Sequence, residues 1–212
     1  MDKAYWDKYY QQHGKDKSIS NCSTFADFCL KNFFSPEGNI VELGSGNGRD
    51  AIYFAQHRHM VTAIDQSTVA IDIEKEGLPP KVGELLKPLA RDFIKEDYTT
   101  FGDIDIFYSR FTMHSITKED EGVLLPKLYN SLQIGGLLCI EARTIKDPLY
   151  GVGEYCDIDT YSTDHRRRFI NSNNFLKSVL KHGFELVYFT EKNNLSVYKD
   201  DNPVLMRVIL RK

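Results

Sequence analysis

The chain has 212 residues, of which 42% are hydrophobic and 27% are charged, and its formal net charge is -3. This length suits a single domain, residues 1–212, and the composition is too apolar for a disordered chain. No apolar run approaches the roughly 18 residues of a membrane span, and the small net charge gives no general attraction to nucleic acid or anionic lipid. The N-terminus also lacks the pattern of a secretory signal. We therefore expect a cytoplasmic domain that binds neither nucleic acid nor membrane.

The first 38 residues are expected to form a helical cap. Tyr5, Trp6, Tyr9 and Tyr10 recur at the spacing of one helix face, and Ser23 is a suitable N-cap for a second helix. Aromatic side chains in such a pattern usually belong to a core.

Beyond residue 38, short apolar runs alternate with segments of helical period. The pattern predicts strands at 39–43, 60–64, 89–93, 104–109, 137–142, 185–190 and 204–210, and helices at 49–57, 69–75, 119–132 and 173–182. This alternation is typical of a doubly wound, Rossmann-like α/β fold with a mostly parallel seven-stranded sheet and helices on both faces. A short polar connection joins the last two strands, which should form an antiparallel pair. Residues 143–168 show little periodicity, and because loops of that length are usually functional, we expect an insert at 143–170 that covers the substrate.

The first strand leads into a glycine-rich turn, E-L-G-S-G-N-G-R-D, over residues 42–50. Glycines let backbone N–H groups approach a ligand closely, and the helix that follows adds a partial positive charge. A small ligand is therefore expected at the carboxyl end of this strand. The dinucleotide fingerprint requires a glycine at the position of Arg49, so an NAD-dependent oxidoreductase is a weaker alternative.

The acid before these glycines and Asp65 at the end of the second strand resemble the class I S-adenosylmethionine-dependent methyltransferases, over about residues 39–142. The resemblance implies that Glu42 and the glycine backbone face the amino acid part of S-adenosylmethionine and that Asp65 accepts hydrogen bonds from both ribose hydroxyls. It places Asp92 on the adenine amino group and Phe93 against the ring. The residues that it implies for the cofactor and its product, S-adenosylhomocysteine, are Glu42, Gly44, Ser45, Gly46, Asn47, Gly48, Asp50, Asp65, Gln66, Asp92, Phe93, Ser109 and Arg110. In this family the first helices also fold over the cofactor.

Methyl transfer is an in-line displacement, and a base is needed only where the acceptor is a weak acid. His114, just after the fourth strand, and His165, in the insert, are the candidate bases, although a histidine at either place is also common as a packed or solvated residue. The segment after the fourth strand lacks the motif in which Asn or Asp is followed by two prolines and an aromatic residue. This argues against the amines of nucleic acid bases as acceptors. No clustered carboxylates or cysteines suggest a metal site.

Three consecutive arginines, residues 166–168, form either a solvated face or an anion site. Guanidinium binds phosphate or carboxylate through paired donors, and in an extended segment only alternate members point inward. The expected substrate-binding residues are Arg110, Arg143, Tyr150, Arg166 and Arg168. They predict a small acceptor that carries phosphate or carboxylate.

The segments D-P-L-Y-G-x-G and H-R-R-R-F are similar to those of small bacterial methyltransferases associated with surface polysaccharide synthesis. This similarity implies O-methylation of a sugar, a nucleotide sugar or a phosphoramidate precursor of such a polysaccharide. An RNA or protein methyltransferase and a non-catalytic S-adenosylmethionine-binding module remain alternatives. The sequence gives no signal for oligomeric state.

Overall fold

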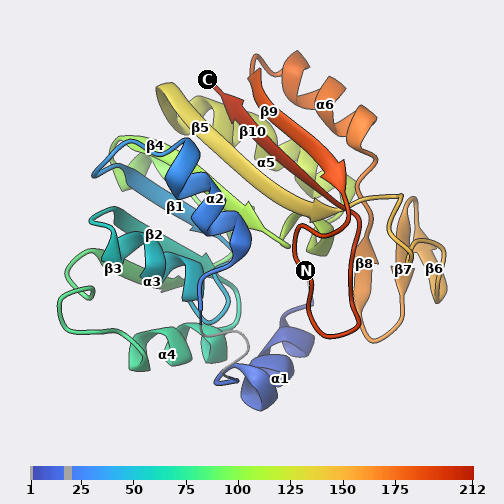
Figure 1. Ribbon diagram of the computed structural model, residues 1–212, viewed down its shortest axis with the longest axis horizontal. Coiled ribbons are helices and arrows are strands. Elements are labelled where there is room, and N and C mark those ends of the chain that lie inside the picture. Colours follow the sequence, from blue (N-terminus) through green and yellow to red (C-terminus); the bar gives the residue numbers. More distant parts are fainter. Residues whose placement is uncertain (1, 17–20) are drawn as a thin grey trace.

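The computed structural model describes residues 2–16 and 21–212, so residues 1 and 17–20 of the expected N-terminal cap lie outside the described residues. One sheet of seven strands has the order β3-β2-β1-β4-β5-β10-β9 (Figure 1). The strands are β1 (Asn39–Leu43), β2 (Met60–Asp65), β3 (Leu86–Ala90), β4 (Ile104–Arg110), β5 (Leu132–Arg143), β9 (Glu185–Lys192) and β10 (Leu205–Arg211). All neighbours are parallel except β10, which is antiparallel to both β5 and β9. The predicted fold class is confirmed.

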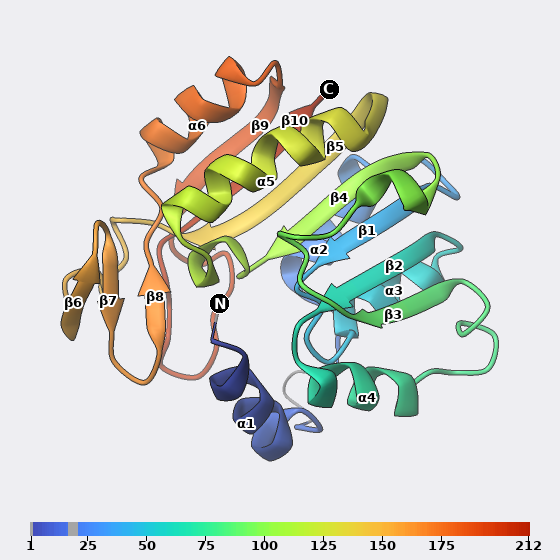
Figure 2. The same ribbon diagram turned by 180° about the vertical axis from the view of Figure 1, so that it is seen from behind.

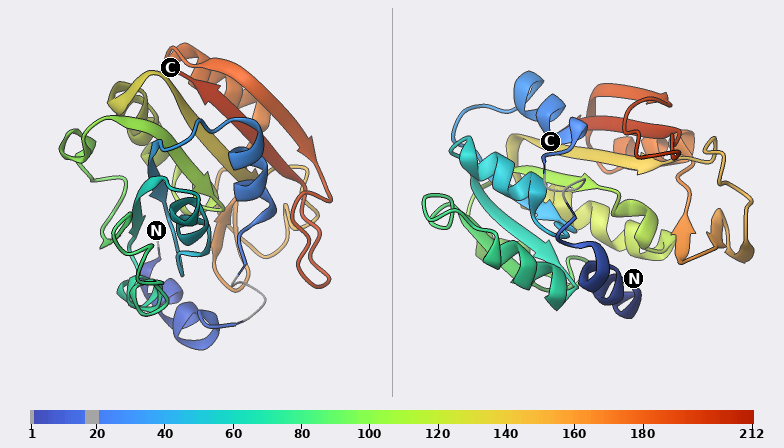
Figure 3. Two further views of the ribbon diagram at one scale, coloured as in Figure 1. Left: turned by 60° about the vertical axis from the view of Figure 1, so that its left-hand side comes forward. Right: turned by 60° about the horizontal axis from the view of Figure 1, so that its bottom comes forward.

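Helices cover both faces of this sheet. The helices are α1 (Lys3–His13), α2 (Thr24–Asn32), α3 (Arg49–Gln56), α4 (Thr68–Glu76), α5 (Lys118–Ser131) and α6 (Ser172–Lys181). In Figure 1, α2 and α3 lie in front of the sheet, whereas Figure 2 shows α5 and α6 on the opposite face. The right-hand view of Figure 3 shows these layers nearly edge-on. Helix α4 packs against β2 and β3, and α1 packs against α4. No helix among the described residues is long and apolar enough to cross a membrane.

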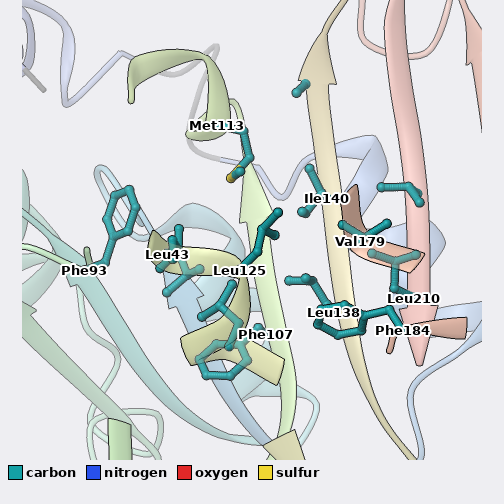
Figure 4. Packing of buried hydrophobic residues seen from close by; sticks show 14 of the residues in the cluster. Leu43, Phe93, Phe107, Met113, Leu125, Leu138, Ile140, Val179, Phe184 and Leu210 are labelled. Carbon is teal, nitrogen blue, oxygen red and sulfur yellow. The ribbon is translucent and has the colours of Figure 1, made fainter. Parts of the chain in front are cut away.

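Each face of the sheet has its own hydrophobic core, because successive side chains of a strand point to opposite faces. On the α5 and α6 face, Leu43, Phe107 and Leu138 pack with Leu125 of α5 (Figure 4). On the other face, Tyr108 and its neighbours pack against Phe25 of α2 and the residues of α3. The sheet is therefore buried on both sides and provides a rigid base for the loops at its strand ends.

The third strand begins three residues earlier than predicted, at Leu86, and contains Pro88. Proline cannot donate a backbone hydrogen bond, so a strand that contains it is expected at the edge of a sheet. In the structure β3 is an edge strand that pairs only with β2, so its other side needs no partner. Pro126 lies inside α5, and although proline removes a backbone donor, the helix continues past it.

The insert contains a small antiparallel sheet of β6 (Glu154–Asp157), β7 (Thr160–Ser162) and β8 (Arg166–Arg168). Its strands have only three or four residues and β6 is exposed throughout, so no alternation of apolar and polar residues marked them in the sequence. Figure 1 shows this sheet beyond the carboxyl ends of the main strands, next to the loop between β9 and β10.

Candidate functional site

A cleft of about 640 Å³ lies at the carboxyl ends of β1, β2, β4 and β5. The sheet order changes direction at β1, which pairs with both β2 and β4, and open α/β sheets bind ligands at such a switch point. Helix α1, the insert and the loop at 193–204 complete the walls. The predicted site residues that line this cleft are Glu42, Gly44, Ser45, Asn47, Asp50, Asp65, Gln66, Phe93, Arg110, His114, Arg143 and His165.

The glycine turn is fixed to the end of β2. The amides of Gly44 and Ser45 both donate to the carbonyl oxygen of Ile64, and the amide of Gly46 donates to Asp65 Oδ2 at 2.9 Å. Gly46 has a φ of 59°, which disfavours a side chain, and an added Cβ would overlap the hydroxyl of Tyr10. The turn must therefore be glycine for α1 to lie this close.

Two buried carboxyl groups have an unpartnered oxygen beside this turn. Glu42 is 3% exposed, and its Oε2 has no partner among the described residues. Burial raises the pKa of Glu42 well above its ordinary value, and the charges of Asp50 and Glu74 raise it further. Glu74 of α4 accepts a hydrogen bond from the Ser45 hydroxyl at 3.1 Å, and burial raises its pKa to about 8. This end of the cleft therefore suits a ligand that brings positive charge or hydrogen-bond donors.

Asp50 lines the cleft, but its carboxylate already has several partners. It accepts hydrogen bonds from the amide of Ser23 at 2.6 Å, from the Ser23 hydroxyl at 2.7 Å and from the Tyr108 hydroxyl at 2.8 Å. Because Ser23 is also the N-cap of α2, Asp50 attaches that helix to α3. The geometry shows a structural task for this residue in addition to its position at the cleft.

Four predicted cofactor residues do not line the cleft. Asp92 accepts a hydrogen bond from the amide of Ile94 at 3.0 Å and lies 3.6 Å from Lys95. Ser109 is 1% exposed and its hydroxyl has no partner among the described residues. Gly46 and Gly48 face Tyr10 and Glu74, which lie so close that neither position has room for a side chain.

Arg110 lies in the floor of the cleft and is held on two sides. Its Nε donates to Glu141 Oε1 at 2.9 Å, and its Nη2 donates to the Ser196 hydroxyl at 2.8 Å. The same Glu141 accepts from Arg207 of β10 at 2.6 Å. The Arg110 guanidinium also lies 4.1 Å from the ring of Phe111, whose φ of 57° is rare for an aromatic residue.

His114 lies on the short 3-10 helix η3 (Met113–Ser115) beyond β4. It is 5% exposed, and its Nδ1 has no partner among the described residues. Burial lowers its pKa well below the ordinary value, and the charges of Arg167 and Arg143 lower it further. The imidazole is therefore neutral at neutral pH and can accept a proton from a group in the cleft.

His165 lies at the mouth of the cleft against α1. Its ring stacks on Tyr5 with centroids 4.6 Å apart, and its Nδ1 is 3.0 Å from Asp164 Oδ2. The Tyr5 hydroxyl donates to the same oxygen at 3.0 Å. These contacts join the N-terminal helix to the insert.

The three arginines of β8 alternate in direction as expected, but with the opposite phase. Arg167 lines the cleft, whereas Arg166 is exposed and Arg168 is buried behind η3. Arg168 donates to Glu121 at 2.7 Å and to the carbonyl oxygens of Met113 and Ile116, both at 2.9 Å. The prediction that Arg166 and Arg168 face the substrate is therefore corrected by the pairing of β8 with β7, which sets the alternation.

Tyr150 also lies outside the cleft, because its hydroxyl donates to Asp159 and its ring packs against Tyr161 and Phe169 of the insert. Arg143 does line the cleft, where Asp147 and Asp201 pair with it. The sequence reasoning missed Arg167 and the loop segment 196–203, which line the cleft, and Glu74, which supports the glycine turn through Ser45. Only Arg167 carried a signal, namely its place in the arginine run.

Residues 41–140 match a family model described as a methyltransferase domain. A search of curated proteins found no match. Among solved structures, the glycopeptide N-methyltransferase MtfA complexed with S-adenosylmethionine is similar, with a TM-score of 0.69, 15% identity, and coverage of 90% of this chain and 94% of that one. The 1,6-didemethyltoxoflavin-N1-methyltransferase of Burkholderia thailandensis gives 0.70 and 16%, over 99% of this chain and 84% of that one. A methyltransferase of Methanosarcina mazei gives 0.71 and 18%, over 86% of this chain and 96% of that one.

The cleft geometry, the matched domain and the shared fold point to one activity. The glycine turn, Glu42 and Asp65 lie where open α/β sheets bind nucleotide-like ligands. The methyltransferase domain match favours S-adenosylmethionine over NAD as the ligand of this cleft. Residues 41–140 belong to a methyltransferase domain family, and the chain as a whole has the fold of S-adenosylmethionine-dependent methyltransferases, which supports an enzyme that uses S-adenosylmethionine as its methyl donor.

Proposed function

We propose that this enzyme methylates an oxygen of a small anionic acceptor, and that the glycine turn side of the cleft binds the methyl donor. The cofactor supplies a methyl group on a positively charged sulfur. The unpartnered Oε2 of buried Glu42 suits the α-ammonium group of such a molecule, and Asp65 lies at the strand end where ribose hydroxyls can donate to its carboxylate. Phe93 offers an apolar surface for the adenine ring, while Gln66, Ser45 and Asn47 offer hydrogen-bonding groups.

His114 is the proposed base. An acceptor hydroxyl would lose its proton to Nδ1 of His114 while its oxygen forms the bond to the methyl carbon, and the carbon–sulfur bond breaks with its electron pair leaving on sulfur. The single observation that carries this proposal is a buried, neutral imidazole with an unpartnered nitrogen at the cleft. An already anionic oxygen would not need this base, so the role of His114 tests whether the acceptor is an alcohol.

The proposed acceptors are a sugar, a nucleotide sugar or a phosphoramidate precursor of a bacterial surface polysaccharide, methylated in the cytoplasm. Support comes from the likeness of the segments at 147–153 and 165–169 to small bacterial methyltransferases of that kind, and from the basic side chains that face the cleft. The basic groups there favour a phosphate- or carboxylate-bearing molecule over a neutral one. The net charge of -3 gives no support to an RNA substrate.

Calorimetric titration with S-adenosylhomocysteine, and in parallel with NAD, tests donor binding. Saturable binding of the first and none of the second is the expected result, and failure to bind S-adenosylhomocysteine would overturn the proposal. A labelled-methyl assay over phosphorylated sugars, nucleotide sugars and phosphoramidates then identifies the acceptor, and analysis of the product shows whether oxygen or nitrogen carries the methyl group.

The variant His114→Gln tests the base, with His57→Gln as the matched control. His57 is an exposed histidine at the end of α3 and does not line the cleft. The expected result is a kcat lowered by about 100-fold or more for His114→Gln with an unchanged Kd for S-adenosylhomocysteine, because general base catalysis contributes roughly 10² to 10⁴ in rate. Equal turnover of the variant and the wild type would remove His114 from the mechanism.

A further inference from the structure

Basic groups from three elements meet on the acceptor side of the cleft. Arg143 comes from the end of β5, His114 from η3, and His165 and Arg167 from the insert. These side chains are far apart in sequence, and the fold brings them to one wall. A basic side chain can bind an anion from the cleft only where no carboxylate or carbonyl of the protein already occupies its N–H donors.

Arg143 and its neighbour Arg168 are satisfied within the protein. Arg143 forms ion pairs with Asp147 and Asp201, and Arg168 forms one ion pair and two hydrogen bonds to backbone carbonyls. Their positive charges are therefore compensated by the fold. They contribute to the shape of the wall more than to its capacity to bind an anion.

Arg167 is different, because its side chain lines the cleft, is 13% exposed, and forms only a long ion pair with a described residue. Its nearest carboxylate oxygen is Asp164 Oδ1, 3.7 Å from Nη2, and Asp164 is itself 60% exposed and shared with Tyr5 and His165. A guanidinium has five N–H donors, and no Arg167 nitrogen is among the buried atoms without a partner, so the donors that lack a protein partner are accessible from the cleft. An oxyanion bound from the cleft would satisfy them with a planar pair of hydrogen bonds.

We propose that Arg167 binds a phosphate or carboxylate group of the acceptor and that this bound oxyanion enables His114 to take up the acceptor proton. This inference rests on the proposed function and adds to it the residue that selects the acceptor and a reason for the selection. A neutral analogue of the same acceptor would lack the negative charge and would be a poor substrate for that reason, even where it fits the cleft.

The reason lies in the charges that face His114. The basic groups are Arg167, Arg143, His165 and Arg168, and the acids nearby, Asp164, Asp147, Asp201 and Glu121, are engaged with those same basic groups. A proton on His114 is therefore repelled by these cations, and Arg167 is the one whose carboxylate partner lies beyond hydrogen-bond distance. An oxyanion held by Arg167 reverses this field, since an opposite charge within about 4–6 Å shifts a pKa by roughly 1–3 units. The negative charge of the acceptor would thus raise the pKa of His114 and favour transfer of the acceptor's own proton to it.

The test uses the full chain saturated with S-adenosylhomocysteine, with its histidines labelled with ¹³C for NMR titration. Inorganic phosphate and acetate serve as separate probes of the two oxyanion classes, and sodium chloride at equal ionic strength serves as the control. The expected result is saturable binding of phosphate, acetate or both, with a rise of about one unit or more in the pKa of His114.

The variants separate a specific site from general charge. Arg167→Gln should weaken oxyanion binding by about tenfold or more and abolish the rise at His114, because a charged paired hydrogen bond is lost. Arg166→Gln removes the same charge from an exposed position on the same strand and should leave both readouts unchanged. Asp164→Asn removes the carboxylate that pairs with Arg167 and should strengthen oxyanion binding.

Three results would overturn the inference: no saturable binding of either probe, equal loss in Arg166→Gln and Arg167→Gln, or oxyanion binding that leaves the pKa of His114 unchanged. The titration with S-adenosylhomocysteine keeps these results distinct from a failure of the proposed function. If that ligand binds and the oxyanions do not, donor binding stands and only the acceptor-side inference falls. If it does not bind, the proposed function itself is refuted.

Discussion

Replacing Arg168 should destabilise the protein far more than replacing its neighbour Arg166. The Arg168 side chain is 7% exposed, and it joins Glu121 of α5 to the two backbone carbonyls that bracket η3. In Arg168→Ala these two carbonyls lose their partner, and Glu121, which is 1% exposed, keeps only Lys118. The variant therefore leaves buried acceptors and a buried charge without compensation.

Removing one partner of a buried ion pair costs about 3–5 kcal/mol. For a domain of this size each kcal/mol lowers Tm by about 2–4 °C, so the expected decrease in Tm is about 6–20 °C. Arg168→Lys keeps the positive charge but not the planar set of donors, and its decrease in Tm should lie between those of the alanine variant and the wild type. Because η3 carries His114, the lysine variant should also lower kcat while the Kd for S-adenosylhomocysteine stays unchanged.

Urea and thermal unfolding followed by circular dichroism measure these differences. Arg166→Ala is the matched control, since the residue is exposed and a surface substitution of this kind changes stability by about 0.5 kcal/mol or less. If Arg168→Ala unfolds within about 1 kcal/mol of the wild type, the reasoning from buried, satisfied groups is refuted.

Three further predictions follow from buried groups around the cleft. The folded-state pKa of Glu74 is raised from 4.5 to about 8, so its contribution to stability is fully present below pH 4.5 and is lost as the pH rises through 8. Glu74→Gln should remove this decrease in the free energy of unfolding between pH 4.5 and 8. Urea unfolding of the variant and the wild type at a series of pH values measures the difference. Gly46→Ala should raise the Kd for S-adenosylhomocysteine by about tenfold in calorimetry, because its Cβ would overlap the Tyr10 hydroxyl and displace this part of the cleft wall. Gly135→Ala, at a positive φ in open space, should lower stability by roughly 1–2 kcal/mol without changing that Kd. Glu141→Gln should lower the free energy of unfolding in urea by about 3 kcal/mol or more, because Arg110 and Arg207 both depend on that charge, and a loss below about 1 kcal/mol would contradict this.

The fold and the donor side of the cleft could be predicted because their signals are local. Alternating apolar runs define the strands, and glycines at 44, 46 and 48 are needed for positive φ in the turn. Ser23 caps α2 as predicted, through a side-chain bond to the amide three residues later, and Ser67 caps α4 in the same way. Such features depend on neighbours within a few residues, which a single sequence displays.

The acceptor side could be predicted only in part, because its geometry depends on contacts between distant segments. The direction of Arg167 follows from the pairing of β8 with β7, and a shift of one residue in that pairing would exchange it with Arg166 and Arg168. Asp92 has the expected place in the sequence, but its carboxylate bonds to the amide two residues later and turns from the cleft. The loop at 196–203 has no motif and reaches the cleft because the β9 and β10 hairpin carries it there.

Glu141 ties three adjacent strands together beneath the cleft, and this has a consequence for how the enzyme is made. Its two partners are Arg110 of β4 and Arg207 of β10, and the latter lies close to the end of the described chain. A nascent chain that has left the ribosome only as far as β5 holds a buried carboxylate with half of its compensation. The stretch that matches the methyltransferase domain, residues 41–140, ends one residue before Glu141. The ion-pair network beneath the cleft is therefore completed only when β10 is inserted between β5 and β9.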